Sequence, residues 1–216
     1  MNTFFDRIVI ANLPARTDRR AAAMAQFMSA NWPFIAPQVF PSVSATPGTL
    51  GNLKTQAAIL AQNAGAAALL ILEDDFVLAQ DFPSVVGAFL AAVPADWDGI
   101  MLGGNHCRKG LPVAPGVVRC VKASETHAYA VRGKLLTELA GLYAAGATSP
   151  GTIWPTVQAT YKVYAPTPWL IGQAAGKSDI SGRMIRERFY NRPGPLLDAN
   201  GRKIPGWPKR SLTPQV

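Results

Sequence analysis

The chain has 216 residues, of which 49% are hydrophobic, and it carries a formal net charge of +8. A chain of this length fits one compact domain, since a single core grows to about 250 residues before it divides. Its longest apolar run, residues 64–72, falls well short of the roughly 18 residues of a membrane-spanning helix, and the first residues lack the features of a signal peptide. These features exclude an integral membrane protein and predict a cytoplasmic one.

The positive charge is concentrated near the carboxyl end. Residues 183–216 hold eight Lys or Arg against two acidic residues, whereas residues 1–182 have a net charge of only +2. Proline and glycine are frequent from residue 192 onward and disfavour helix or strand there. The sequence therefore predicts a domain at residues 1–182 and a basic arm at residues 183–216 that contacts a polyanion.

Strand and helix signals alternate along the first 182 residues. Runs rich in β-branched and other apolar residues predict strands at residues 7–13, 39–43, 67–72, 99–102, 117–121, 128–131 and 162–165. Segments rich in helix formers predict helices at residues 19–30, 52–64, 82–93 and 133–145. This order predicts an α/β fold with a doubly wound, mostly parallel sheet flanked by helices, whose ligand crevice lies beyond the carboxyl ends of the strands.

Three consecutive acids, Glu73, Asp74 and Asp75, follow the apolar strand of residues 67–72. Adjacent like charges repel one another, and a divalent cation relieves that repulsion. Side chains alternate along a strand, so Glu73 and Asp75 share one side, where they can hold Mg²⁺ or Mn²⁺ while water and diphosphate oxygens fill the other positions. The alternative is that the acids cap the next segment or pair with Arg19 or Arg20.

Five motifs in order resemble glycosyltransferase family 25, which includes lipopolysaccharide-biosynthesis and collagen galactosyltransferases and has a GT-A fold. They are N-L-x-x-R-x-D-R at residues 12–19, L-E-D-D at 72–75, D-W-D at 96–98, an Ala-Tyr strand at 126–131, and Gln173 followed by S-D-I at 178–180. The sequence departs from the family pattern at two places, both where the donor or acceptor sugar could be recognised. Thr55-Gln56 stands where the family has Ser-His, and residues 149–157 lack an expected aspartate.

The resemblance implies a role for each polar group near the strand ends. The residues expected to bind a nucleotide-sugar donor, with UDP as its nucleotide, are Asn12, Leu13, Arg16, Arg19, Glu73, Asp74 and Gln173. Asp75 is the principal metal ligand, joined by Glu73 and by His127, one of only two histidines in the chain.

An inverting transfer needs a general base, for which the candidates are Asp179, Glu125 and Asp98, with Asp179 ranked first because glycines surround it. Contacts with the acceptor or with a polyanion are expected from Lys54, His106, Arg183, Arg186, Arg188 and Trp207. Cys107 and Cys120 lack metal-ligand spacing and are expected to be free thiols.

The sequence favours a manganese- or magnesium-dependent glycosyltransferase that extends a bacterial surface saccharide, with its basic arm on the anionic inner face of the membrane. An alternative acceptor is DNA with hydroxymethylated bases, as in viral DNA modification, in which case the enzyme works in the host cytoplasm and the arm binds phosphates. A third hypothesis, from another class, is a non-catalytic nucleic-acid-binding protein built on a transferase-like domain.

Overall fold

The computed structural model describes residues 3–146, 150–187 and 189. Within these residues no helix is both long enough and apolar enough to cross a bilayer. Cys107 is exposed and Cys120 is buried, and both are free thiols, as the sequence predicted. Residues 190–216, which make up most of the basic arm, and Arg188 lie outside the described residues, so the division of the chain at residue 182 stays a prediction.

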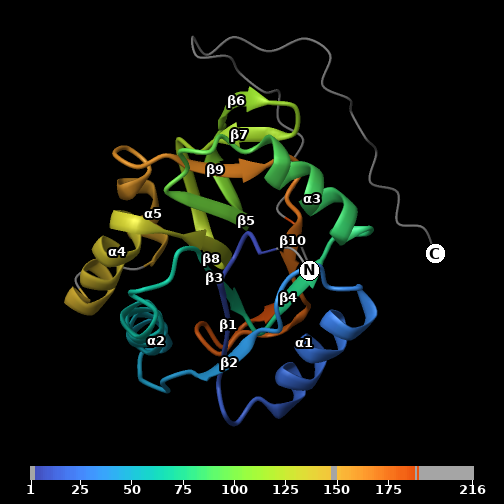
Figure 1. Cartoon of the computed structure of the whole chain (residues 1–216). Coiled ribbons are helices and arrows are strands. Elements are labelled where there is room, and N and C mark those ends of the chain that lie inside the picture. Colours follow the sequence, from blue (N-terminus) through green and yellow to red (C-terminus); the bar gives the residue numbers. More distant parts are fainter. Residues whose placement is uncertain (1–2, 147–149, 188, 190–216) are drawn as a thin grey trace.

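An eight-stranded sheet forms the centre of the protein (Figure 1). In spatial order its strands are β2 (Gln38–Pro41), β1 (Arg7–Asn12), β3 (Leu69–Glu73), β8 (Lys122–Val131), β5 (Gly99–Arg108), β9 (Val163–Pro166), β7 (Val117–Arg119) and β6 (Leu111–Ala114). The pairings give six strands one direction, and only β8 and β7 run the opposite way. The predicted α/β class with a mainly parallel sheet is therefore confirmed.

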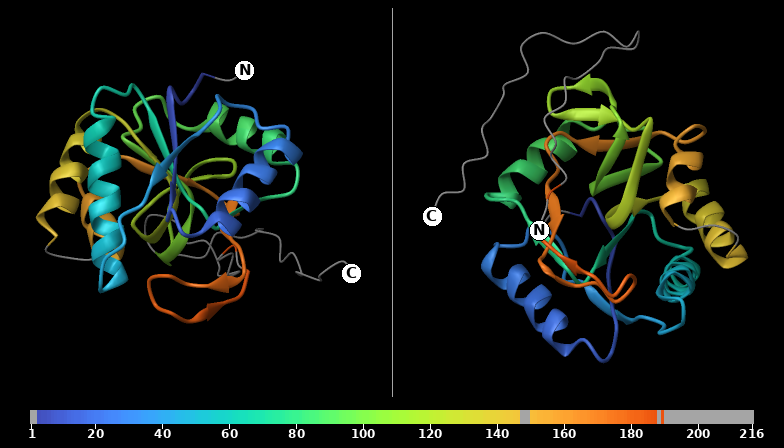
Figure 2. Two further views of the ribbon diagram at one scale, coloured as in Figure 1. Left: turned by 90° about the horizontal axis from the view of Figure 1, so that it is seen from below. Right: turned by 180° about the vertical axis from the view of Figure 1, so that it is seen from behind.

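Helices cover both faces of this sheet, as the two views in Figure 2 show. One face packs against α1 (Thr17–Ser29) and α3 (Phe82–Ala92), and the other against α2 (Gly48–Gln62), α4 (Gly133–Ala145) and α5 (Pro150–Val157). Strand β3 lies between both cores, because Leu70 and Leu72 face the first and Leu69 and Ile71 the second, all fully buried. Two apolar faces explain why this strand reads as an unbroken apolar run.

Several elements differ from the sequence expectation. Strand β5 continues six residues past the strand expected at residues 99–102, and β8 begins six residues before the strand expected at residues 128–131, because the two pair along an irregular antiparallel ribbon. Short strands without a strong sequence signal also form, namely β4 (Phe76–Leu78), β6, β10 (Ile171–Gln173), β11 (Gly176–Lys177) and β12 (Met184–Ile185). Helix α1 begins at Thr17, two residues before the helix expected at residues 19–30.

Two of these short pairings build the edge of the sheet where the acids lie. Strand β4 follows Asp75 directly and pairs with β10, which places Gln173 opposite Phe76. Strands β11 and β12 form a hairpin beyond β10, drawn in orange below the sheet in the left view of Figure 2. Segments about 100 residues apart in the sequence thus meet at the carboxyl end of β3.

Candidate functional site

A cleft opens at the carboxyl ends of β1 and β3, where the sequence predicted the ligand crevice. It holds about 800 Å³ of empty space, part of it open to solvent. Its walls come from the ends of β1 and β3, the loop after β2, the first turns of α2, and the β11–β12 hairpin. The predicted site residues that line it are Leu13, Arg19, Glu73, Asp74, Asp75, Gln173 and Asp179.

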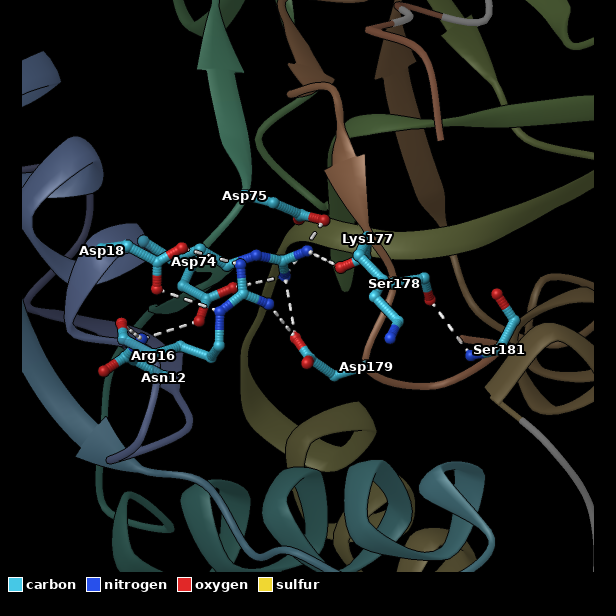
Figure 3. A network of polar contacts seen from close by, with 10 residues as sticks. Asn12, Arg16, Asp18, Asp74, Asp75, Lys177, Ser178, Asp179 and Ser181 are labelled. Carbon is cyan, nitrogen blue, oxygen red and sulfur yellow. Dashed lines mark hydrogen bonds and ion pairs between the residues drawn. The ribbon is translucent and has the colours of Figure 1, made fainter. Parts of the chain in front are cut away.

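Asp74 is the best-anchored acid of the triplet (Figure 3). Its Oδ2 atom accepts a hydrogen bond from Asn12 Nδ2 at 2.7 Å, and Arg19 Nη1 lies 3.0 Å from its Oδ1 atom. Asn12 Nδ2 also donates to the carbonyl oxygen of Arg16 at 3.1 Å. The end of β1 and the start of α1 are thereby tied to the end of β3.

Two arginines of the first helix and its cap hold the β11–β12 hairpin against the cleft. Arg16 Nη1 donates to Asp179 Oδ2 at 2.5 Å, and Arg19 Nη1 lies 3.6 Å from the same oxygen. Arg19 also donates to the carbonyl oxygen of Lys177 at 2.8 Å. A Cβ atom on Gly48 would lie 2.8 Å from the Cα atom of Ile180, so only glycine lets this loop reach α2.

Glu73 and Asp75 lie in an environment that disfavours negative charge. Burial, followed by the nearby charges of Asp75, Asp74 and Glu125, raises the pKa of Glu73 to about 8. Burial also raises the pKa of Asp75, although the Arg19 guanidinium 3.6 Å away acts against this shift. Burial and the neighbouring acids therefore outweigh the positive charge of Arg19 at these two carboxyl groups.

The donor set of the cleft fits a hard divalent cation bound together with phosphate. Among the described residues, no group of three or more His, Cys, Asp or Glu side chains could by itself hold a metal ion. Mg²⁺ and Mn²⁺ bound with a nucleotide need only one or two carboxylates, with water and phosphate oxygens completing the shell. Asp75 Oδ1 is a buried oxygen without a hydrogen-bond partner in the described part of the chain, as expected of such a ligand.

Three cleft residues on α2 were given no role from the sequence, namely Asn52, Thr55 and Gln56, although Thr55-Gln56 was noted as a departure that concerns substrate recognition. Thr55 Oγ1 accepts a hydrogen bond from Val43 N at 2.8 Å and donates to the carbonyl oxygen of Gly51, which fixes the loop after β2. Asn52 hydrogen-bonds to Glu73. Their spacing of three and four residues places all three on one face of the helix, and this signal could have identified them.

Three predicted site residues lie away from the cleft. Asp98 precedes β5 at the amino edge of the sheet, five residues or about 17 Å along the strands from the level of Glu73, and accepts a hydrogen bond from Lys162 N. His127 is fully buried, with Nε2 3.1 Å from the Ile171 carbonyl oxygen, so it is not placed as a metal ligand. Lys54 borders a different groove, between α2 and α4.

The remaining predicted residues lie around the cleft or outside the described chain. Glu125 is close enough to Glu73 to affect its pKa and has a positive φ of 64° within β8. Arg183 and Arg186 are exposed on the hairpin, where an acceptor could reach them. Trp207, like Arg188, lies outside the described residues.

His106 is mostly buried rather than presented to an acceptor. Its ring stacks on Trp169 with centroids 4.3 Å apart, and neither ring nitrogen has a hydrogen-bond partner among the described residues. Burial lowers the pKa of His106 to about 4. The imidazole is therefore neutral in the folded protein at neutral pH.

This environment predicts that acid weakens the fold through His106. Below pH 6.5 the unfolded state binds a proton that the folded state rejects until about pH 4, so stability falls as pH falls through this range. Replacing His106 by phenylalanine, which can still stack on Trp169, is expected to remove roughly 2 kcal/mol of the loss between pH 7 and pH 5. Urea unfolding of both proteins at the two pH values measures this, and equal losses would contradict the burial of a neutral imidazole.

Comparisons with known proteins give no family assignment, since no family model and no curated protein matches the chain. Among solved structures it is similar to A197 from STIV, with a TM-score of 0.45, 8% identity, and coverage of 84% of this chain and 93% of that one. It is also similar to a glycosyltransferase involved in the glycosylation of the major capsid of PBCV-1, with a TM-score of 0.44, 10% identity and 67% coverage of each chain. Mannose-1-phosphate geranyltransferase from Thermus thermophilus gives a TM-score of 0.40, 10% identity, and coverage of 74% and 72%. These values describe a distant likeness in the arrangement of the chain.

Proposed function

We propose that the chain is a metal-dependent glycosyltransferase that takes its sugar from a nucleotide-sugar bound in the cleft. The observation that carries the proposal is the juxtaposition of Asp74 and Asp75 at the end of β3 with Arg19 of α1, which shares Asp179 with Arg16. Residues 12–19 and 72–75, two of the motifs that resemble glycosyltransferase family 25, supply most of these groups. Their meeting at one cleft supports a donor site there.

Arg16 and Arg19 would bind the diphosphate. Guanidinium groups form charge-assisted, often bidentate hydrogen bonds with phosphate oxygens. Both arginines are already held at the cleft by Asp74 and Asp179, so they need little reorganisation before they contact phosphate. The ordering cost of binding is correspondingly small.

Asp75 and Glu73 would hold Mg²⁺ or Mn²⁺ beside the diphosphate. The cation, when bound, neutralises negative charge on the nucleotide diphosphate as it leaves. Without a cation, the raised pKa of Glu73 keeps this carboxyl group mostly protonated near neutral pH. Asn52, which hydrogen-bonds to Glu73, would fix the orientation of that carboxyl group.

The general base is better assigned to Glu125 than to Asp179, which the sequence ranked first. Two guanidinium groups, 2.5 and 3.6 Å from one oxygen of Asp179, already occupy that carboxylate, so it is poorly placed to take a proton from an acceptor hydroxyl. Asp179 would instead anchor the hairpin. Glu125 forms no such ion pair within the described residues and lies near enough to Glu73 to raise its pKa.

The acceptor would be a bacterial surface saccharide, and hydroxymethylated DNA is the alternative to be tested beside it. The purified chain with Mn²⁺ should be given UDP-, GDP-, TDP- and CMP-sugars, each with a lipopolysaccharide-type oligosaccharide, with 5-hydroxymethylcytosine DNA, or with water alone. At least one donor should release its nucleotide in a reaction that EDTA stops. The absence of both turnover and calorimetric binding across the whole panel would refute the proposal.

A further inference from the structure

Gln56 lines the innermost wall of the cleft and is fully buried, yet only one end of its amide is used. Its Oε1 atom accepts a hydrogen bond from the Tyr129 hydroxyl at 2.7 Å. Its Nε2 atom has no hydrogen-bond partner in the described part of the chain. A buried donor left without a partner destabilises the folded state, so such groups are rare unless they have a function.

A chain of hydrogen bonds determines which end of the amide faces the cleft. Trp154 Nε1, which can only donate, lies 3.0 Å from the Tyr143 hydroxyl, and Tyr143 is hydrogen-bonded to Tyr129. Every buried hydroxyl proton finds an acceptor if Tyr143 donates to Tyr129 and Tyr129 donates to Gln56 Oε1. This arrangement leaves the two N–H groups of Gln56 as the free end.

A second buried glutamine shows the contrast within the same protein. Gln158 Oε1 accepts from Ala123 N at 2.7 Å, and its Nε2 atom donates to the Ala123 carbonyl oxygen at 2.8 Å. Both ends of Gln158 thus serve the fold, and the residue does not line the cleft. Gln56 is also buried, but its Nε2 atom has no hydrogen-bond partner among the described residues and can contact a ligand.

We infer that Gln56 is a specificity-determining residue. Its Nε2 group donates a hydrogen bond to an uncharged oxygen of the bound nucleotide-sugar. The inference rests on the proposed function and deepens it. Arg19 in the cleft wall, with Arg16 beside it on Asp179, suits the diphosphate, whereas the Gln56 amide has no net charge and suits a base carbonyl or a sugar hydroxyl. A site built to hydrogen-bond a ligand oxygen strongly rejects analogues that lack it.

The test compares binding of three ligands to the wild-type protein and to Gln56→Met, which removes the amide without adding charge. The ligands, each with Mn²⁺, are the best-binding nucleotide-sugar of the panel above, the nucleoside diphosphate released from it, and inorganic pyrophosphate. Isothermal titration should show at least a tenfold loss of affinity for the nucleotide-sugar and no change for pyrophosphate, which has neither a base carbonyl nor a sugar hydroxyl to accept from Gln56. A parallel loss for the nucleoside diphosphate places the oxygen on the nucleotide, and an unchanged affinity places it on the sugar.

Two further variants keep the test interpretable if Gln56→Met folds poorly. Tyr129→Phe leaves the Gln56 amide free to rotate and should weaken nucleotide-sugar binding while sparing pyrophosphate. Gln158→Glu, the matched control, should lower the melting temperature but leave the affinities of the folded protein unchanged.

Equal nucleotide-sugar affinity in the wild type and in Gln56→Met would overturn the inference and leave the proposed function standing, with the amide then serving a buried water. A loss that includes pyrophosphate would overturn it as well, because it would mark Gln56 as structural. A wild-type protein that binds pyrophosphate but no nucleotide-sugar would instead overturn the proposed function, and this inference with it.

Discussion

Replacing Asp75 by asparagine is expected to lower kcat/KM for sugar transfer by about a thousandfold and to raise the melting temperature of the metal-free protein. Activity falls because an amide is a poor ligand for a hard divalent cation, and the leaving diphosphate loses its charge neutralisation. Stability rises because burial and the charge of Asp74 disfavour the ionised form of Asp75 in the folded state, as its raised pKa indicates. Nucleotide release with Mn²⁺ and thermal unfolding in EDTA measure the two effects.

A lower kcat/KM combined with a higher melting temperature distinguishes a functional carboxylate from one that stabilises the fold. Asp81, an exposed aspartate at the start of α3, supplies the matched control, since asparagine tolerates its left-handed backbone conformation. Asp81→Asn should change neither rate nor melting temperature appreciably. Sugar transfer by Asp75→Asn at the wild-type rate would contradict the assignment of Asp75 as a metal ligand.

Local patterns were enough to locate the acidic end of the cleft. Strand β3 was predictable because the run from Leu69 to Leu72 meets apolar cores on both faces, and the acids that follow it must then lie at the edge of the sheet. Helix α4 was predicted with its observed bounds, residues 133–145, because glycine at each end delimits a run of helix formers. Such features depend on neighbouring residues alone.

Features that depend on distant pairing could not be found in this way. Nothing in residues 122–131 indicates that β8 inserts antiparallel between β3 and β5, and no pattern around Gln173 indicates that it pairs beside Phe76. His127 is not placed as a metal ligand, because Gly103 packs closely against its ring. A Cβ atom added at Gly103 would lie only 2.3 Å from His127 Nε2. Asp98 could have been excluded, since a residue just before a parallel strand lies at the edge opposite the crevice.

Removing the positive charge of Arg19 is expected to destabilise the protein by roughly 3 kcal/mol at pH 7, because it leaves carboxylates in the cleft without their counterion. Arg19 Nη1 lies within 3.6 Å of Asp74, Asp75 and Asp179, and the side chains of Asp74 and Asp75 are only 9% and 12% exposed. Arg19→Met keeps most of the aliphatic stem and removes the charge together with the hydrogen bond to Lys177. Urea unfolding at pH 7 measures the loss.

Arg20, the exposed next residue of α1, is the control, and Arg20→Met should change stability by no more than about 0.5 kcal/mol. The loss in Arg19→Met should shrink toward pH 4, where protonated carboxyl groups no longer need a counterion. Mn²⁺ should also restore part of the lost stability, because a cation at Asp75 replaces some of the missing positive charge. A loss at pH 7 that neither acid nor Mn²⁺ reduces would mean that Arg19 acts through packing, and its positive charge would then not be what holds the carboxylates of the cleft together.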